Sequence, residues 1–171
     1  MKVLRKQTNS KTCFACGVDN PASPKAEFYE MEDGSLAALV TCKSFHMSYP
    51  STVHGGVSAT LLDETMGRSM LCCDPNTWGV TLELNVKYKK PVPYDVQLRV
   101  TGRVIEERPR VFITEGEILL PDGTVAAYGS GVYFKSVTTG AADAGLSDLQ
   151  LYPREDDPTE IDLPSPPRGE G

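Results

Sequence analysis

The feature that most constrains the fold is one change of hydrophobic period along the chain. At residues 54–73 apolar side chains recur at helical spacings, and no proline interrupts them. At 80–88 the period becomes two, which is typical of a half-buried strand with Val80, Leu82, Leu84, Val86 and Tyr88 on one face. Three further strand-like runs follow at about 96–105, 111–120 and 125–134. The pattern predicts one long helix followed by four strands.

Two more strand-like runs precede the helix. They lie at 26–31 and 36–42 and flank Asp33-Gly34, a dipeptide suited to a tight hairpin turn. Consecutive strands indicate an antiparallel sheet, because parallel neighbours need a crossover connection. A lone helix that is apolar over much of its circumference has to be wrapped by that sheet. We therefore expect an α+β domain with an antiparallel sheet around one long central helix.

Length and composition indicate a single domain with flanking segments. A chain of 171 residues with 40% apolar content is long enough for one core and short for two. We expect an N-terminal segment at 1–24, the folded domain at 25–136, and a tail at 137–171. The tail is rich in Pro and acidic residues and poor in apolar surface, so we expect it to be flexible.

Charge and cysteine content limit the binding partners and the cellular compartment that we expect. The formal net charge of −6 disfavours a nucleic-acid binder, which normally carries a basic stripe. No apolar stretch approaches the length of a membrane span, and the first residues do not resemble a secretory signal. Five cysteines without an export signal indicate reduced thiols. We therefore expect a cytoplasmic protein that binds neither nucleic acid nor membranes.

The segment from His54 to Asp63 carries the chemistry. His54-Gly55-Gly56 opens the predicted helix, and free amides at a helix start can polarise a carbonyl oxygen or hold an oxyanion. Glycine lets a substrate approach that backbone closely. Asp63 follows inside an apolar stretch, where a carboxylate is costly unless it is paired or functional. It is a candidate general base or nucleophile. The alternative, for Asp63 as for the neighbouring Glu64, is an ordinary acid that is solvated or ion-paired.

Helix geometry adds a constraint on that pair. Gly55 and Asp63 are eight residues apart, which is about 12 Å along one helix. Both groups cannot reach one small carbonyl from the same chain. A shared site therefore requires two antiparallel helices from different subunits, and two-fold symmetry then creates two equal sites.

These residues resemble a known family. The stretch from His54-Gly55-Gly56 to Asp63, followed by the run at 86–91, is similar to the hotdog-fold acyl-CoA thioesterases of the PaaI type, over roughly residues 12–135. The resemblance implies a hotdog fold and Asp63 as the catalytic acid. It also implies that the Gly55 amide polarises the thioester carbonyl and that Thr81 helps to place the attacking water.

Further residues are assigned to substrate binding. His54 and Gly56 flank the catalytic amide, and Ser48 stands where many relatives carry an asparagine. Lys89 and Arg110 are candidates for binding the phosphates of coenzyme A. For any single lysine, the more common explanation is that it lies on a solvated strand face or at a sheet edge, where its charge prevents pairing with another chain.

The predicted function is hydrolysis of an acyl-CoA thioester to a free acid and CoA, without a metal or organic cofactor. The predicted assembly is a homodimer, with a dimer of dimers left open. One alternative is a non-catalytic acyl-CoA-binding hotdog protein, in which Asp63 only satisfies buried amides. Another is a hotdog dehydratase or hydratase that uses His54 with an acid.

The pair Cys13 and Cys16 has zinc-ligand spacing. A single Cys-x-x-Cys lacks the second pair that makes a zinc site convincing, so we expect small buried thiols and no metal. If a metal were bound, the candidate partners would be Cys72, Cys73, His46 and His54.

Overall fold

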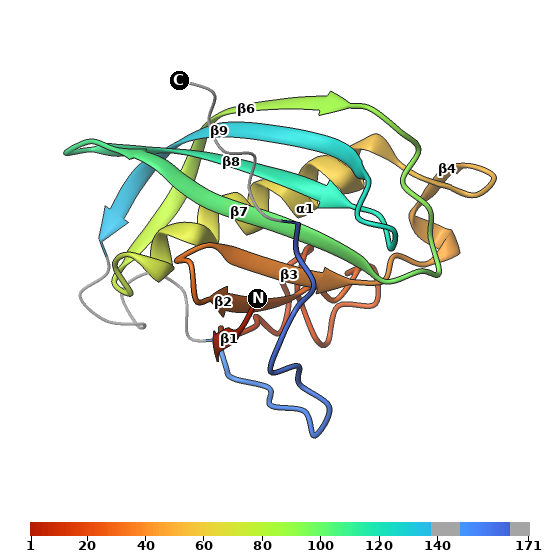
Figure 1. The fold of residues 1–171 in the computed structure, drawn as a ribbon, viewed down its shortest axis with the longest axis horizontal. Helices are drawn as coiled ribbons and strands as arrows, with labels where there is room; N and C mark the ends of the chain where they lie inside the picture. Colours follow the sequence, from red (N-terminus) through yellow and green to blue (C-terminus); the bar gives the residue numbers. More distant parts are fainter. Residues whose placement is uncertain (138–147, 165–171) are drawn as a thin grey trace.

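A seven-stranded antiparallel sheet wraps around one helix in the computed structural model, which describes residues 1–137 and 148–164 (Figure 1). The strands follow each other across the sheet in the order β1-β2-β3-β7-β8-β9-β6. Their bounds are β1 Val3–Lys6, β2 Glu27–Met31, β3 Leu36–Val40, β6 Thr77–Tyr88, β7 Leu98–Glu107, β8 Val111–Leu119 and β9 Val125–Val137. The expected α+β hotdog architecture is confirmed, since the two predicted strands before the helix and the four after it all form.

The helix α1 (Gly55–Arg68) lies across the concave face of the sheet and continues into a short 3-10 turn, η2 (Ser69–Cys72). Together they match the expected helical segment at 54–73. The chain turns at Asp74-Pro75, because proline cannot donate the amide hydrogen bond and restricts the residue before it.

The main core lies between α1 and the sheet. Leu61, Leu62 and Met66 of the helix are fully buried against it. Gly102 of β7 lets the helix approach closely, since a Cβ there would lie 2.7 Å from the carbonyl oxygen of Thr65. The close approach fixes the height of the helix above the sheet, and with it the position of the helix residues that point toward β6 and β9.

Some elements had no clear sequence signal. The N-terminal segment contributes β1, which pairs with β2 at one edge of the sheet. Before the helix, a 3-10 turn η1 (Ser44–His46) leads into a small hairpin of β4 (Met47–Tyr49) and β5 (Thr52–Val53). The hairpin places Val53 in the core and delivers the chain to the start of α1.

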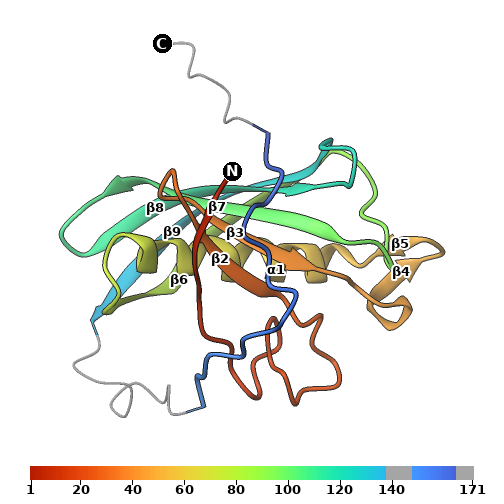
Figure 2. The ribbon, with the colours of Figure 1, turned by 60° about the horizontal axis from the view of Figure 1, so that its bottom comes forward.

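Part of the segment expected to be flexible has a defined course. Residues 148–164 run past β1 and onto the face of the sheet opposite α1, where Ile161 and Leu163 are buried (Figure 2). The backbones of Lys2 and Glu160 pair in an isolated antiparallel β-bridge along this segment. The rest of the predicted flexible tail, at 138–147 and 165–171, lies outside the described residues.

Strand β6 departs from simple alternation. A bulge falls between Thr81, which pairs with Tyr133, and Glu83, which pairs with Val132. The extra residue switches which side chains face the helix. Leu84 and Val86 pack against the core as expected, and Tyr88 keeps the same face and reaches the start of the helix, although it is 54% exposed. Val80 and Leu82 are 53% and 61% exposed, so the expected single apolar face is wrong for these two residues.

Candidate active site

Asp63 is held by two hydroxyl groups from neighbouring strands. Thr81 of β6 donates a hydrogen bond from Oγ1 to Oδ1 of Asp63 at 2.9 Å. Tyr133 of β9 donates from its phenol to the same Oδ1 at 3.1 Å and lies 3.2 Å from the Asp63 carbonyl oxygen. Since Thr81 and Tyr133 are direct partners across β6 and β9, one rung of the sheet supplies both donors.

The β6 bulge makes this arrangement possible. Strict alternation would place Thr81 on the face opposite to Leu84 and Val86. The inserted Leu82 lets all three side chains point toward the helix. Bulges recur beside active sites because they re-aim a side chain in this way.

Tyr133 is a buried donor that keeps its proton. Its side chain is 1% exposed and stacks on Phe112, with ring centroids 5.2 Å apart. Burial, and next the negative charge of Asp63, raise the pKa of Tyr133 well above the ordinary value for a phenol. The hydroxyl therefore stays protonated and fixes the orientation of the carboxylate.

The start of α1 forms a second cluster of polar groups. His54 caps the helix, and its Nδ1 accepts the Gly56 N–H at 2.9 Å. Tyr88, at the end of β6, donates from its phenol to the Gly55 carbonyl oxygen at 2.7 Å. Within residues 1–137 and 148–164 the Gly55 N–H has no hydrogen-bond partner. This amide is free to donate to a ligand at the positive end of the helix dipole.

The two clusters do not meet within one chain. Asp63 lies eight residues beyond Gly55 on the same continuous helix, about 12 Å away along the axis. One chain therefore presents an amide donor at one place and a held carboxylate at another.

The remaining predicted binding residues are spread over the surface. Ser48 lies on the exposed strand β4. Lys89 follows β6 at the end that contacts Gly55, whereas Arg110 precedes β8 at the opposite end, where its carbonyl accepts from Lys135. The structure does not bring Lys89 and Arg110 together within one chain.

Glu64 points away from Asp63, as adjacent helix positions must. Its Oε1 accepts from Nε of Arg68 at 2.6 Å, one turn further along α1. Arg68 is only 4% exposed and lies over the rings of Phe28 and Trp78, 4.5 Å and 5.4 Å from their centroids. Glu64 is therefore part of a buried ionic cluster and not of the Asp63 site.

The same cluster contains the N-terminal cysteines. The ligand atoms of Cys13, Cys16 and Glu64 all lie within 4.8 Å of one another. The partners that the sequence suggested, Cys72, Cys73, His46 and His54, do not join this group. The hydrogen bond between the two thiols lowers the pKa of Cys13 to about 6 and raises that of Cys16.

Two residues of the site had no useful sequence signal. Tyr133 and Tyr88 read as ordinary strand residues, because aromatic side chains are common in sheets. Their roles depend on register across β6 and β9 and on where α1 crosses the sheet, and neither can be read from local spacing.

Comparison with known proteins agrees with this architecture. Residues 51–127 match the family model described as Thioesterase superfamily, a range that includes the start of α1, Asp63 and Thr81. A solved thioesterase superfamily protein, RHA08564, superposes with a TM-score of 0.66 at 30% identity, covering 71% of this chain and 59% of the other. The chain has the hotdog fold of the thioesterase superfamily. The resemblance seen in the sequence is thereby confirmed, while its PaaI-type branch remains a prediction.

Other proteins similar to this chain add detail. The protein BH2602 of Bacillus halodurans, solved with CoA, has a TM-score of 0.54 at 29% identity over 58% of this chain and 66% of its own. Human acyl-coenzyme A thioesterase 13 is 26% identical over 85 residues, which are 50% of this chain and 61% of the human protein. The match thus spans about three fifths of that relative. An uncharacterized protein of Schizosaccharomyces pombe is 26% identical over 124 residues, 70% of this chain and 69% of that one.

No helix among the described residues is long and apolar enough to cross a membrane.

Proposed function

We propose that this protein is an acyl-CoA thioesterase whose site combines Asp63 of one subunit with the Gly55 amide of the other. The observation that carries the proposal is the pair of hydrogen bonds from Thr81 and Tyr133 to Asp63. Two hydroxyl donors on one oxygen fix the direction of the carboxylate and leave its second oxygen available. That is the arrangement a general base or nucleophile requires.

The proposed reaction uses few parts. The thioester carbonyl oxygen accepts a hydrogen bond from the Gly55 N–H, which stabilises the negative charge that develops as the carbonyl carbon is attacked. Asp63 removes a proton from water as that water attacks, or attacks directly and is released by water afterwards. Thr81 lies beside the carboxylate and helps to place the water. The carbon–sulfur bond breaks, the thiolate of CoA takes up a proton, and the free acid leaves.

A dimer through β6 supports this site. β6 is an edge strand that pairs with β9 on one side only among the described residues. Its exposed side chains include Val80 and Leu82, so the edge carries apolar surface that a second copy would cover. An antiparallel pair of β6 strands related by two-fold symmetry would place the Gly55 end of one subunit toward the Asp63 end of its partner.

The same symmetry supports the proposed phosphate contacts. Lys89 and Arg110 lie at opposite ends of β6 in one chain, so antiparallel pairing would bring Lys89 toward the partner subunit's Arg110. Both are exposed and neither belongs to an ion pair among the described residues. They would offer positive charge to the phosphates of CoA at the mouth of each site. His54, Gly56 and Ser48 complete the proposed set of substrate-binding residues. The proposal also includes a cytoplasmic location and leaves open the association of two dimers into a tetramer.

The names of the related proteins support acyl-CoA as the substrate. Human acyl-coenzyme A thioesterase 13 is named for this reaction, and the Bacillus halodurans protein was solved with CoA. The test is a panel of aromatic, short-chain and medium-chain acyl-CoA esters, with release of the thiol followed by a trapping dye. Turnover that Asp63→Asn abolishes, with binding retained, supports the enzyme.

Two outcomes would replace the proposal. Tight binding of acyl-CoA without turnover of any ester would indicate a non-catalytic binding protein. Hydration of an enoyl-CoA ester that depends on His54, without thiol release, would indicate a hydratase.

A further inference from the structure

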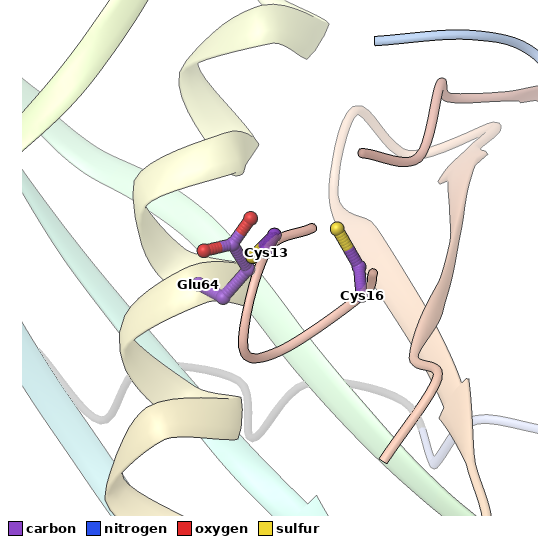
Figure 3. Close-up of side chains that lie close together, drawn as sticks. All are labelled: Cys13, Cys16 and Glu64. Atoms are coloured by element: carbon purple, nitrogen blue, oxygen red, sulfur yellow. The ribbon is translucent and has the colours of Figure 1, made fainter. Parts of the chain in front are cut away.

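A second group of chemically capable side chains lies on another face of α1, about 100° around the helix from the face that Asp63 presents to β6. Glu64 projects from the helix toward the loop that carries Cys13 and Cys16 (Figure 3). Cys16 is fully buried, Cys13 is half-buried, and the Glu64 side chain is 28% exposed. All three ligand atoms fall within 4.8 Å of one another.

We propose that Cys13, Cys16 and Glu64 form a binding site for a thiophilic divalent cation, with Zn²⁺ as the best fit. Sulfur and carboxylate ligands in tetrahedral geometry are typical of zinc. Ligand distances of about 2.3 Å for sulfur and 2.1 Å for oxygen place tetrahedral ligand atoms about 3.6 to 3.8 Å apart. The observed spacing therefore needs only small side-chain movements to close around an ion.

The backbone holds the two sulfurs in place for this role. The Ala15 N–H donates to Sγ of Cys13 at 3.3 Å, and Gly17 closes the turn with a hydrogen bond to the Cys13 carbonyl at 2.9 Å. A Cβ at Gly17 would lie 2.3 Å from that carbonyl oxygen, so only glycine permits the turn. The loop is thus a tight, pre-formed structure that points two thiols at one place.

The surrounding charges favour thiolates and a dication. Arg68 lies with Nη2 3.5 Å from Sγ of Cys16 and is also paired with Oε1 of Glu64. Two thiolates, one carboxylate and a dication carry a net charge of −1, which the buried guanidinium of Arg68 balances. Oε2 of Glu64 makes no hydrogen bond within the described ranges and is available to the ion. A disulfide would leave the carboxylate without a ligand role and would weaken both N–H···S interactions, which favour charged sulfur.

The ion would join the N-terminal loop to the helix beside the proposed catalytic acid. No fourth Cys, His, Asp or Glu ligand atom joins the group within residues 1–137 and 148–164. Water would complete the tetrahedron from the half-exposed Cys13 side. The site differs from the sequence expectation, which considered other cysteines and histidines as partners and favoured no metal.

The test uses the untagged full-length protein, purified under reducing conditions and free of chelator. Elemental analysis after dialysis against Zn²⁺ should give one zinc per chain. Replacement by Co²⁺ should give the visible bands of a tetrahedral site and a sulfur-to-cobalt charge-transfer band. Neither measurement depends on thioesterase activity.

Variants locate the ion. Cys13→Ser should weaken zinc binding by more than about 100-fold, since even outer-shell changes cost 10- to 100-fold. Glu64→Gln should weaken it as well and keep the charge-transfer band, while the matched control Cys73→Ser, at an exposed cysteine outside the cluster, should bind zinc normally. Far-UV circular dichroism verifies that each variant is folded.

Three results would overturn the proposal. The first is a dialysed protein sample that contains no more zinc than the buffer around it. The second is a folded Cys13→Ser variant that binds zinc as tightly as the unchanged protein. The third is a Cys13–Cys16 disulfide as the stable form in reducing buffer.

Discussion

The hydroxyl of Thr81 lies 2.9 Å from Oδ1 of Asp63, although the two residues belong to an edge strand and a central helix 18 positions apart. The contact exists because β6 bulges at Leu82 and turns Thr81 inward. A strand irregularity and a helix carboxylate thus form one unit, to which Tyr133 adds a second donor.

Tyr133 should act as a positioning residue for Asp63. Replacing Tyr133 by Phe removes one hydrogen bond to the carboxylate and keeps the buried ring. A hydrogen bond to a charged group contributes about 1.5 to 3 kcal/mol, so kcat should fall by about tenfold or more, while KM changes by less than about twofold. Steady-state kinetics on the best acyl-CoA ester measure the split. Equal changes in kcat and KM, or none, would show that Tyr133 only fills space.

The exposed edge of β6 should be the subunit interface. Leu82 is 61% exposed on this edge, and Leu4 is 63% exposed on β1 at the other edge of the sheet. Leu82→Asp should convert the dimer to a monomer and abolish turnover, because a desolvated charge at an interface is costly. Leu4→Asp is the matched control and should remain dimeric. Light scattering with size-exclusion chromatography measures both, and a dimeric Leu82→Asp protein would place the interface elsewhere.

Much of the fold follows from the sequence, whereas the assembly of the site does not. The change of period at 54–73 and 80–88 sets the helix, the strands and the antiparallel sheet, since these depend on local side-chain spacing. The packing of Ile161 and the formation of strand β1 could not be predicted, because both depend on contacts with residues far away in the sequence. The local composition of these two segments is polar and gives no sign of such contacts. The Asp63 site depends on the bulge at Leu82, which reverses the expected alternation.

Alkaline pH should destabilise the fold partly through Tyr133. Burial and the nearby Asp63 charge raise its pKa well above 10.0, the ordinary value that an unfolded chain retains. The folded state therefore keeps the phenolic proton when the unfolded state loses it, so stability is full below pH about 10 and falls as pH rises above it. Urea unfolding at pH 8 and at pH 10.5 gives the free energy of unfolding at each pH. The decrease between the two should be smaller for Tyr133→Phe than for the unchanged protein. Equal losses would mean that Tyr133 is not a source of the decline.

The segment at 148–164 should contribute to stability. Ile161 is 4% exposed against the outer face of the sheet, whereas Leu151 in the same segment is 54% exposed. Ile161→Ala should lower the free energy of unfolding by about 2 to 4 kcal/mol. Leu151→Ala should change it by less than about 0.5 kcal/mol. Chemical denaturation measures both, and an Ile161→Ala protein as stable as the Leu151→Ala control would show that the segment does not hold to the sheet in solution.

The most direct test of a site shared between subunits is complementation between two inactive proteins. Asp63→Asn removes the carboxylate, and Gly55→Pro removes the amide hydrogen at the first helical position, where proline is well tolerated. His54 already has the extended ψ of 136° that a residue before proline prefers. Each variant alone should be inactive and folded.

In a mixed dimer, one site receives Asp63 from the Gly55→Pro subunit and the Gly55 amide from the Asp63→Asn subunit, while the second site receives neither. After the two proteins are mixed in equal amounts, unfolded and refolded together, half of the dimers are mixed and about a quarter of the original activity should return. No recovery, with mixed dimers demonstrated by mass spectrometry, would contradict a site built from two chains.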